Sequence, residues 1–169
     1  AVLDIESKSF TGVYSLGTVD YSNVKIDINK NDNEDERGYS PDNYNDVLGL
    51  RMPDGISAYK SGDKTYIITA NEGDSREWGD YSNESEGKLT SVSGVKTDKK
   101  VTYLNSDDYD GLESGKTYLY GSRSFSIYEV TDSGIDLVFD SGSDFEAKTA
   151  EYLPEYFNCS NDSLDIDDR

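Results

Sequence analysis

Charged and aromatic side chains are concentrated in residues 69–80, "TANEGDSREWGD", directly after the strand-like run "TYIITA". The segment holds five charged residues and the only tryptophan of the chain: Glu72, Asp74, Arg76, Glu77, Asp80 and Trp78. Loops at the ends of strands often carry binding residues. Because Gly73 permits a tight turn, the Asn71 amide and the two carboxylates beside it could converge on one hard cation. The sequence therefore predicts an acidic mouth at the end of this strand.

In this binding interpretation, Glu72 and Asp74 hold the ion, and Arg76, Glu77 and Trp78 line the mouth. A structural interpretation is equally favoured. Arg76 would then offset the charge of its neighbours, and Trp78 would cover a hydrophobic edge of the fold. The two interpretations predict different surroundings for the same carboxylates.

A second candidate site is the run "DINKNDNED", residues 27–35, in which oxygen-bearing residues alternate. The expected calcium ligands are Asp27, Asn29, Asn31 and Asp35 through their side chains and Asn33 through its carbonyl. Alternate side chains with an intervening carbonyl can supply the six to eight oxygens that calcium needs. The run is not an EF-hand, because Asp32 stands where that loop needs Gly and Gly38 where it needs Glu. A solvated acidic loop is the alternative interpretation.

Arg123 lies inside the strand-like run "YGSRSFSIYE". In a strand it alternates with Phe125 and Ile127 and so points to the same face as they do. A buried arginine needs a carboxylate partner, which either the 69–80 segment or the acidic pair in "SGSDFE" could supply. We expect a structural ion pair here rather than an anion-binding site.

The charge balance is strongly acidic, with 35 acidic and 16 basic residues, no histidine and a formal net charge of -19. Such a surface repels phosphate backbones, so we expect no nucleic-acid partner, and it attracts cations. The same acidity is also consistent with solubility alone. A 12% content of aromatic residues argues against disorder over most of the length.

The missing histidines and the single cysteine, Cys159, exclude the usual zinc and copper sites and the nucleophilic triads. Any metal should be a hard cation on oxygen ligands, calcium before magnesium. No apolar run approaches the length of a membrane-spanning helix, so we expect no membrane insertion of this segment.

Strand and turn signals dominate the chain. Hairpins are predicted over "VLDIESKSFTGVYSL", "ISAYKSGDKTYIITA" and "YLYGSRSFSIYEVTDSGIDLVFDSG", and "KVTYL" is a further strand. Each hairpin joins two apolar runs through a short turn rich in Asp, Gly or Ser. "DFEAKTAEYLPEYF" has helical spacing until Pro154 ends it.

These elements predict an all-β fold, a partial β-propeller of about three to four blades with long acidic loop insertions. Residues 20–46 form the main insertion, and residues 158–169 form a polar tail. The chain begins on a strand-like run and ends at Arg169 after an acidic stretch. We therefore expect residues 1–169 to be a fragment of one larger propeller-like domain. The remaining blades are the expected partner, in the same chain or as a separate one.

The segment "MPDGISAYKSGDKTYIITANEGDSREWGDY" resembles the signature of the choice-of-anchor I family, which also occurs in mesenchyme-specific cell surface glycoproteins. "LDIESKSFTGVYSLGTVDYS" and "YLYGSRSFSIYEVTDSGIDLVFDSGSDFE" are similar to the earlier and later parts of the same domain, so the resemblance covers almost the whole chain. It implies an extracellular or cell-surface protein with a β-propeller-like domain. Some relatives carry an alkaline-phosphatase label. Where this chain has "DINKNDNEDERGY", the family has a tighter "D-x-S-D-x-D-G" loop.

The favoured function is a secreted or cell-surface β-propeller module, stabilised by calcium, with a binding or structural role. The alternative is a metal-dependent phosphoesterase, alkaline-phosphatase-like, whose acidic pocket includes residues 69–80. A plain adhesion or surface-layer component without a site is a third interpretation.

Overall fold

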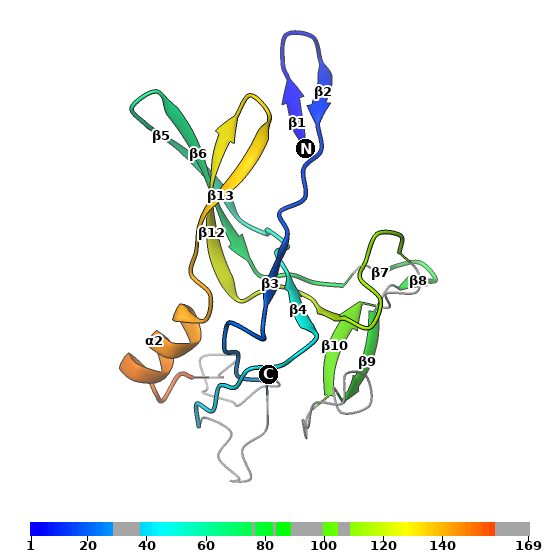
Figure 1. Ribbon diagram of the computed structural model, residues 1–169, viewed down its shortest axis with the longest axis vertical. Coiled ribbons are helices and arrows are strands. Elements are labelled where there is room, and N and C mark those ends of the chain that lie inside the picture. Colours follow the sequence, from blue (N-terminus) through cyan, green and yellow to red (C-terminus); the bar gives the residue numbers. More distant parts are fainter. Residues whose placement is uncertain (29–37, 76, 83, 89–99, 105–108, 158–169) are drawn as a thin grey trace.

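The computed structural model describes residues 1–28, 38–75, 77–82, 84–88, 100–104 and 109–157 (Figure 1). The strands are β1 (Val2–Asp4), β2 (Ser9–Gly12), β3 (Thr18–Asp20), β4 (Val47–Leu50), β5 (Ile56–Ser61), β6 (Lys64–Asn71), β7 (Glu77–Trp78), β8 (Tyr81–Ser82), β9 (Glu84–Lys88), β10 (Lys100–Leu104), β11 (Thr117–Leu119), β12 (Ser124–Thr131) and β13 (Gly134–Asp140). One helix, α2 (Asp144–Tyr152), occurs in the described part. The predicted all-β class is confirmed, whereas no closed ring of blades is present in the described residues.

The four-stranded sheet has the order β13-β12-β6-β5, and every neighbouring pair is antiparallel. Its strands follow one another across the sheet in chain order, with β7 to β11 inserted between β6 and β12. The predicted hairpins "ISAYKSGDKTYIITA" and "SFSIYEVTDSGIDLVFD" are its two halves, and both are confirmed. Their turns form locally because Gly62 adopts a positive φ of 60° and Gly134 one of 148°.

The second large sheet has the order β3-β4-β11-β10-β9. The predicted strand "KVTYL" is β10, which pairs antiparallel with β9 and β11. β4 and β11 pair in parallel, with Val47 opposite Thr117. This pairing joins segments far apart in the chain, which no local turn signal indicates.

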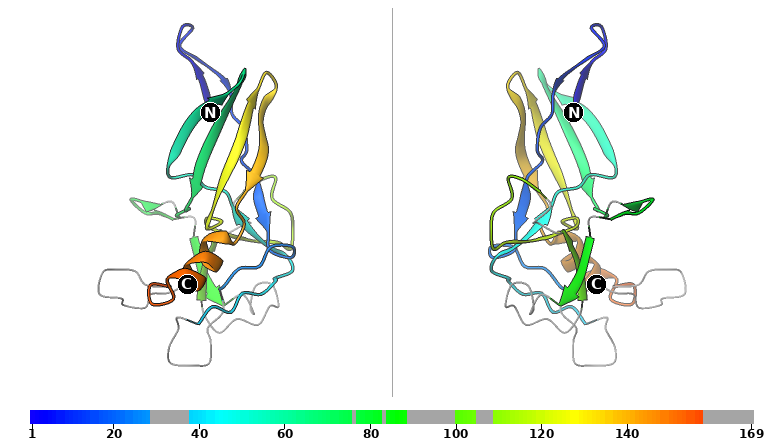
Figure 2. Two further views of the ribbon diagram at one scale, coloured as in Figure 1. Left: turned by 90° about the vertical axis from the view of Figure 1, so that its left-hand side faces the viewer. Right: turned by 90° about the vertical axis from the view of Figure 1, so that its right-hand side faces the viewer.

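The first predicted hairpin, β1 with β2, is also confirmed, with Leu3 opposite Phe10. It projects away from both sheets (Figures 1 and 2). Leu3, Ile5, Phe10 and Val13 are all exposed in or beside this hairpin.

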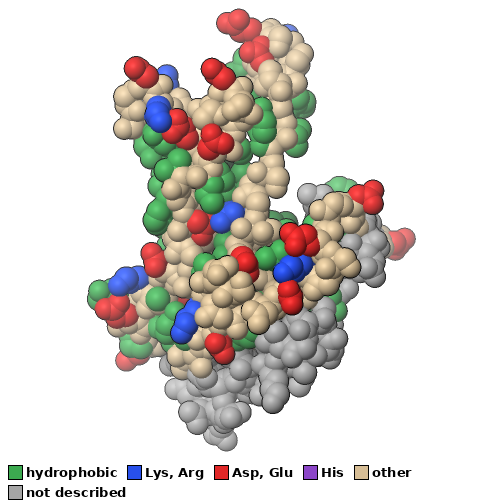
Figure 3. Space-filling view, viewed as in Figure 1, with side chains coloured by type: hydrophobic (Ala, Val, Ile, Leu, Met, Phe, Trp, Pro, Cys, Tyr) green, Lys and Arg blue, Asp and Glu red, His purple; other side chains and the backbone are tan. Residues whose placement is uncertain are grey.

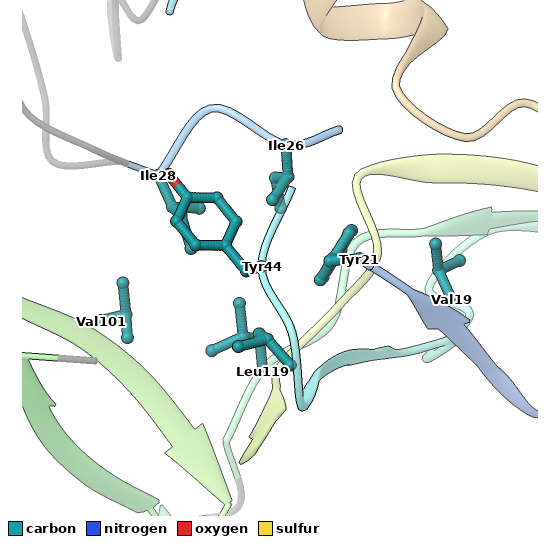
Figure 4. Packing of buried hydrophobic residues seen from close by; sticks show 8 residues of the cluster. Val19, Tyr21, Ile26, Ile28, Tyr44, Val101 and Leu119 are labelled. Atoms are coloured by element: carbon teal, nitrogen blue, oxygen red, sulfur yellow. The ribbon is translucent and has the colours of Figure 1, made fainter. Parts of the chain in front are cut away.

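The main hydrophobic core lies beside the five-stranded sheet (Figure 4). Its buried members are Val19, Tyr21, Ile26, Ile28, Tyr44, Val47, Val101 and Leu119. Residues 20–46 therefore contribute buried side chains from both of their ends. The two ends pair through an isolated bridge between Ile26 and Asp42. Residues 29–37 of that segment, and the tail 158–169, lie outside the described residues.

Alternation along the four-stranded sheet separates an apolar face from a polar one. The apolar face consists of Tyr59, Tyr66, Ile68, Phe125, Ile127 and Phe139, with Phe145 of α2 beside it. Tyr59 stacks on Tyr66 with ring centroids 5.1 Å apart. The rings of Phe125 and Phe139 lie 5.5 Å apart. Figure 3 shows hydrophobic side chains along these hairpins and acidic side chains near their tips.

The polar face carries Thr69, Asn71, Ser124, Ser126 and Asp140. It is covered by the segment before β3 and the residue after β4, because Tyr128 Oη donates to the Leu16 carbonyl (3.1 Å) and Arg51 reaches Asp140. The predicted helix is confirmed as α2, which ends before Pro154. Its first turn contains Asp144 and Glu146, whose charge suits a helix N-terminus.

Candidate functional site

The segment after β6 and the segment before β12 meet through two glycines. Gly73 and Gly121 have positive φ angles of 83° and 72°. A Cβ atom on Gly73 would overlap the backbone nitrogen of Gly121, and a Cβ atom on Gly121 would overlap the carbonyl oxygen of Glu72. The Ser122 N–H also donates to the Asn71 carbonyl at 3.2 Å. This contact fixes the predicted acidic mouth against the segment that carries Arg123.

Asn71 faces away from the mouth, so the predicted convergence of its amide with the neighbouring carboxylates is wrong. Its side chain is buried, accepts a hydrogen bond from Thr69 (2.8 Å) and donates to Ser124 (3.0 Å) and Ser126 (2.7 Å). The alternation of β6 places Asn71 on the polar face of the sheet. All its hydrogen-bonding groups are used there, so it holds β6 to β12.

The polar face ends at an ion pair that the sequence reasoning missed. Arg51 Nε donates to Asp140 Oδ2 at 2.8 Å, and Ser126 donates to the same oxygen at 2.7 Å. Burial alone would raise the pKa of Asp140. The hydrogen bonds from Ser126, Arg51 and the Gly142 N–H hold that pKa below its ordinary value. Arg51 thereby ties the "GLRMPDG" segment to the end of β13.

Arg123 precedes β12 rather than lying inside it, so its predicted place in the strand alternation is wrong. It has a positive φ of 51°, which is unusual for a residue other than Gly. The predicted structural ion pair is confirmed, because Nη1 donates to Glu146 Oε1 at 2.6 Å. The partner comes from the "SGSDFE" pair and not from the 69–80 segment. Burial raises the pKa of Glu146, against the opposing effect of the Arg123 guanidinium.

Asp27, the first predicted calcium ligand, is buried at this same junction. Its N–H donates to Glu146 Oε2 (3.0 Å), its carbonyl accepts from Arg123 (3.0 Å), and its Oδ2 accepts from the Ser40 N–H (3.0 Å). The other predicted ligands of this run lie outside the described residues: Asn29, Asn31, Asn33 and Asp35. The calcium site there stays a prediction.

The acidic mouth itself is open to solvent. Glu72 and Asp74 are exposed, and Trp78 is 72% exposed, so its ring is not buried against a hydrophobic edge. Arg76 lies outside the described residues, and of Glu77 only the backbone, in β7, is described. In the described part of the chain, no three acidic residues, with or without Cys159, are grouped so as to hold a metal ion.

A pocket of about 390 Å³ adjoins the mouth, lined by Met52, Pro53, Asp54, Glu72, Gly73 and Asp74. Sequence reasoning missed Asp54 as a member of this group. The signal was the position of "MPDG" directly before β5, because the strand pairing returns that segment to the end of β6. The Asp54 N–H donates to the Ala70 carbonyl at 2.9 Å. Two conserved-looking sequence segments are thus brought together by ordinary sheet hydrogen bonds.

A second cavity of about 260 Å³ lies on the other side of Gly73. Its wall contains Gly73, Asp74, Ser75, Tyr120, Gly121 and Arg123, and its floor contains Tyr21, Ile26, Ile28, Val101, Thr102 and Leu119. Burial raises the pKa of the Tyr21 hydroxyl, which has no hydrogen-bond partner among the described residues. That hydroxyl lies against Gly49 rather than in the open cavity.

Comparison with known proteins assigns the chain to a family. The model of the choice-of-anchor I domain matches residues 1–169, which confirms the resemblance seen in the sequence. Neither the curated proteins nor the solved structures contain a match. Domains of this kind are associated with the anchoring of secreted proteins at the cell surface, which indicates an extracellular or cell-surface module. No helix of the described residues is long and apolar enough to span a membrane.

Proposed function

The chain belongs to the choice-of-anchor I family, and on this basis we propose that it is a secreted or cell-surface β-propeller module with a binding or structural role. The observation that carries the proposal is the four-stranded antiparallel sheet β13-β12-β6-β5. Its strands follow one another across the sheet in chain order, which is the arrangement of a propeller blade. The insertion of β7 to β11 between its two hairpins enlarges the loops at one end of the blade.

The apolar face of this sheet supports a partner in the form of another sheet. Tyr59 is 41% exposed, Phe139 is 44% exposed and Phe145 is 53% exposed, so a band of aromatic rings faces solvent. Exposed apolar bands of this kind mark interaction surfaces. Sheets that pack face to face interdigitate such side chains at a spacing of about 10 Å. The proposed partner is the remainder of the same propeller, in the same chain or as a separate one.

Calcium stabilisation is part of the same proposal. Its support is the alternation of oxygen ligands over residues 27–35 and the placement of Asp27 at a junction that joins α2 to the segment before β12. An ion held there would order a segment next to the core. The acidic mouth, lined by Glu72 and Asp74, is the proposed binding end of the blade, where loops follow strands. No observation favours the alternative of a metal-dependent phosphoesterase.

Footprinting of aromatic side chains tests the proposal. Protein isolated from its source without denaturant is labelled with hydroxyl radicals, and modification is read by mass spectrometry. Tyr59 and Phe139 should be protected relative to Tyr156, which is 56% exposed and lies after α2. Labelling of all three in proportion to their exposure in the chain alone would refute a sheet packed on the apolar face.

A further inference from the structure

The cavity beside Gly73 has oppositely charged side chains on one rigid wall. Asp74 directly follows Gly73, and Arg123 lies two residues after Gly121. Because the two glycine backbones touch, the segments that carry these charges are fixed relative to each other. Preorganised groups of this kind lower the entropic cost of binding. The wall therefore offers an acceptor and a donor for one small molecule.

Arg123 retains donors for a ligand. Its two hydrogen bonds to described residues, to the Asp27 carbonyl and to Glu146, both start from Nη1. The guanidinium has five N–H donors in a planar fork, so those on Nε and Nη2 remain. The side chain of Arg123 is 35% exposed, whereas that of Glu146 is 8% exposed. The accessible part of the guanidinium can therefore receive a carboxylate.

Asp74 supplies the opposite charge at the rim of the cavity. Its Oδ1 accepts a hydrogen bond from the Ser75 N–H at 2.7 Å. An ionised carboxylate has about four acceptor sites on its two oxygens, so this bond leaves capacity for an ammonium group. Charge-assisted hydrogen bonds are roughly twice as strong as neutral ones, which favours a cationic nitrogen at this position.

The floor of the cavity is aliphatic. Ile26, Ile28, Val101 and Leu119 are buried members of the main core, and they also line the cavity (Figure 4). The volume of about 260 Å³ lies just below the range of about 300–1,000 Å³ for pockets that take drug-sized ligands. A molecule the size of an amino acid matches this space, and an aliphatic side chain matches this floor.

We propose that this cavity binds a free α-amino acid with an aliphatic side chain. Its carboxylate pairs with Arg123, its ammonium group pairs with Asp74, and its side chain packs on the floor formed around Ile28. A zwitterion has no net charge, so the net charge of -19 neither attracts nor repels it at long range. This inference does not depend on the propeller or on calcium.

Calorimetric titration with L-leucine tests the proposal. We expect a dissociation constant of about 1 mM or tighter, a value suited to a ligand of this size. 4-Methylpentanoate lacks the ammonium group and 3-methylbutylamine lacks the carboxylate, so each should bind at least tenfold more weakly. Binding of leucine should change little between low and high salt, because the ligand carries no net charge. Absence of binding at about 10 mM leucine, tenfold above the expected constant, would overturn the proposal.

Variants locate the site. Asp74→Asn should weaken leucine binding at least tenfold, whereas Asp54→Asn, in the neighbouring pocket, should leave it unchanged. Because Arg123 also holds Glu146 in place, its replacement can unfold the protein. Thr102→Trp instead fills the cavity from its exposed rim and should abolish binding while Arg123 stays in place. Equal binding by wild type and Asp74→Asn, or equal affinity for glucose or for either singly charged analogue, contradicts a zwitterion site.

Discussion

Gly73 and Gly121 lie backbone to backbone, so closely that neither position has room for a Cβ atom. The contact joins the two segments in which the sequence concentrates its charged and aromatic residues. It also sets the position of Asp74 relative to Arg123 on the wall of the cavity. The backbone geometry of two glycines thus determines the chemistry of the site more directly than any charged side chain.

Gly121→Ala should be strongly destabilising. The new methyl group would collide with the carbonyl of Glu72, in addition to the cost of a positive φ, so we expect a loss of about 4 kcal/mol or more. Gly111→Ala is the matched control, because Gly111 has a positive φ of 86° but open space around its Cα. It should lose only about 1–2 kcal/mol. Urea denaturation gives both values, and similar losses would show that the collision is relieved.

Asp140→Asn should reveal the ion pair with Arg51. The two side chains are 14% and 11% exposed, so breaking the pair should cost about 3 kcal/mol at neutral pH. Asp46→Asn is the control, because the Asp46–Lys116 pair is 55% and 30% exposed and should cost less than about 1 kcal/mol. Chemical denaturation of both variants measures the difference. Equal small losses would contradict a structural role for Arg51.

The pH dependence of that effect has a definite sign. The pKa of Asp140 is lowered from 3.8 in the folded protein, so its contribution to stability is present above pH 3.8 and is lost as the pH falls through the folded pKa. The advantage of the wild type over Asp140→Asn should therefore be constant near neutrality and shrink in acid below that value. An advantage that grows on acidification would contradict the assignment.

Glu146 should show the opposite dependence. Burial raises its pKa above 4.5, so its contribution is fully present below pH 4.5 and is lost as the pH rises through the folded pKa. Glu146→Gln cannot titrate at this position. The free energy of unfolding of the wild type minus that of the variant should therefore fall between about pH 4 and pH 7. A difference that rises over this range would show that the Arg123 pair outweighs burial.

Calcium should raise the melting temperature of the protein. Thermal unfolding in excess chelator is compared with unfolding in millimolar calcium, for wild type and for Asn31→Ala. Only the wild type should gain stability, because ligand binding to the folded state alone stabilises it. Asn45→Ala, an exposed position outside the predicted ligand run, serves as the control and should respond as the wild type does. An unchanged melting temperature in the wild type contradicts calcium stabilisation.

The hairpins could be predicted because their information is local. Short turns with Gly62 or Gly134 lie between apolar runs, and the period of two in each run identifies a strand. The parallel pairing of β4 with β11 could not be predicted, since it joins Val47 to Thr117 across an insertion that carries no matching signal. The class of fold was accessible, and the way its two sheets are joined was not.

The candidate site was predicted in part for the same reason. Position after a strand identified Glu72 and Asp74, but strand alternation, which turns Asn71 inward, was not applied to it. The pair of Arg51 and Asp140 spans 89 residues, and a single sequence contains nothing that links two such distant positions. Polar residues in the strongest motifs therefore looked like ligands where several of them hold the sheets together.

Native mass spectrometry of the protein isolated from its source, without denaturant, tests the central claim most directly. A blade with an uncovered apolar face should be recovered with the sheets that cover it, whether these are joined covalently or not. The account predicts a species heavier than the 18.8 kDa of this chain that contains further propeller sequence. A stable, soluble species of 18.8 kDa alone would contradict it.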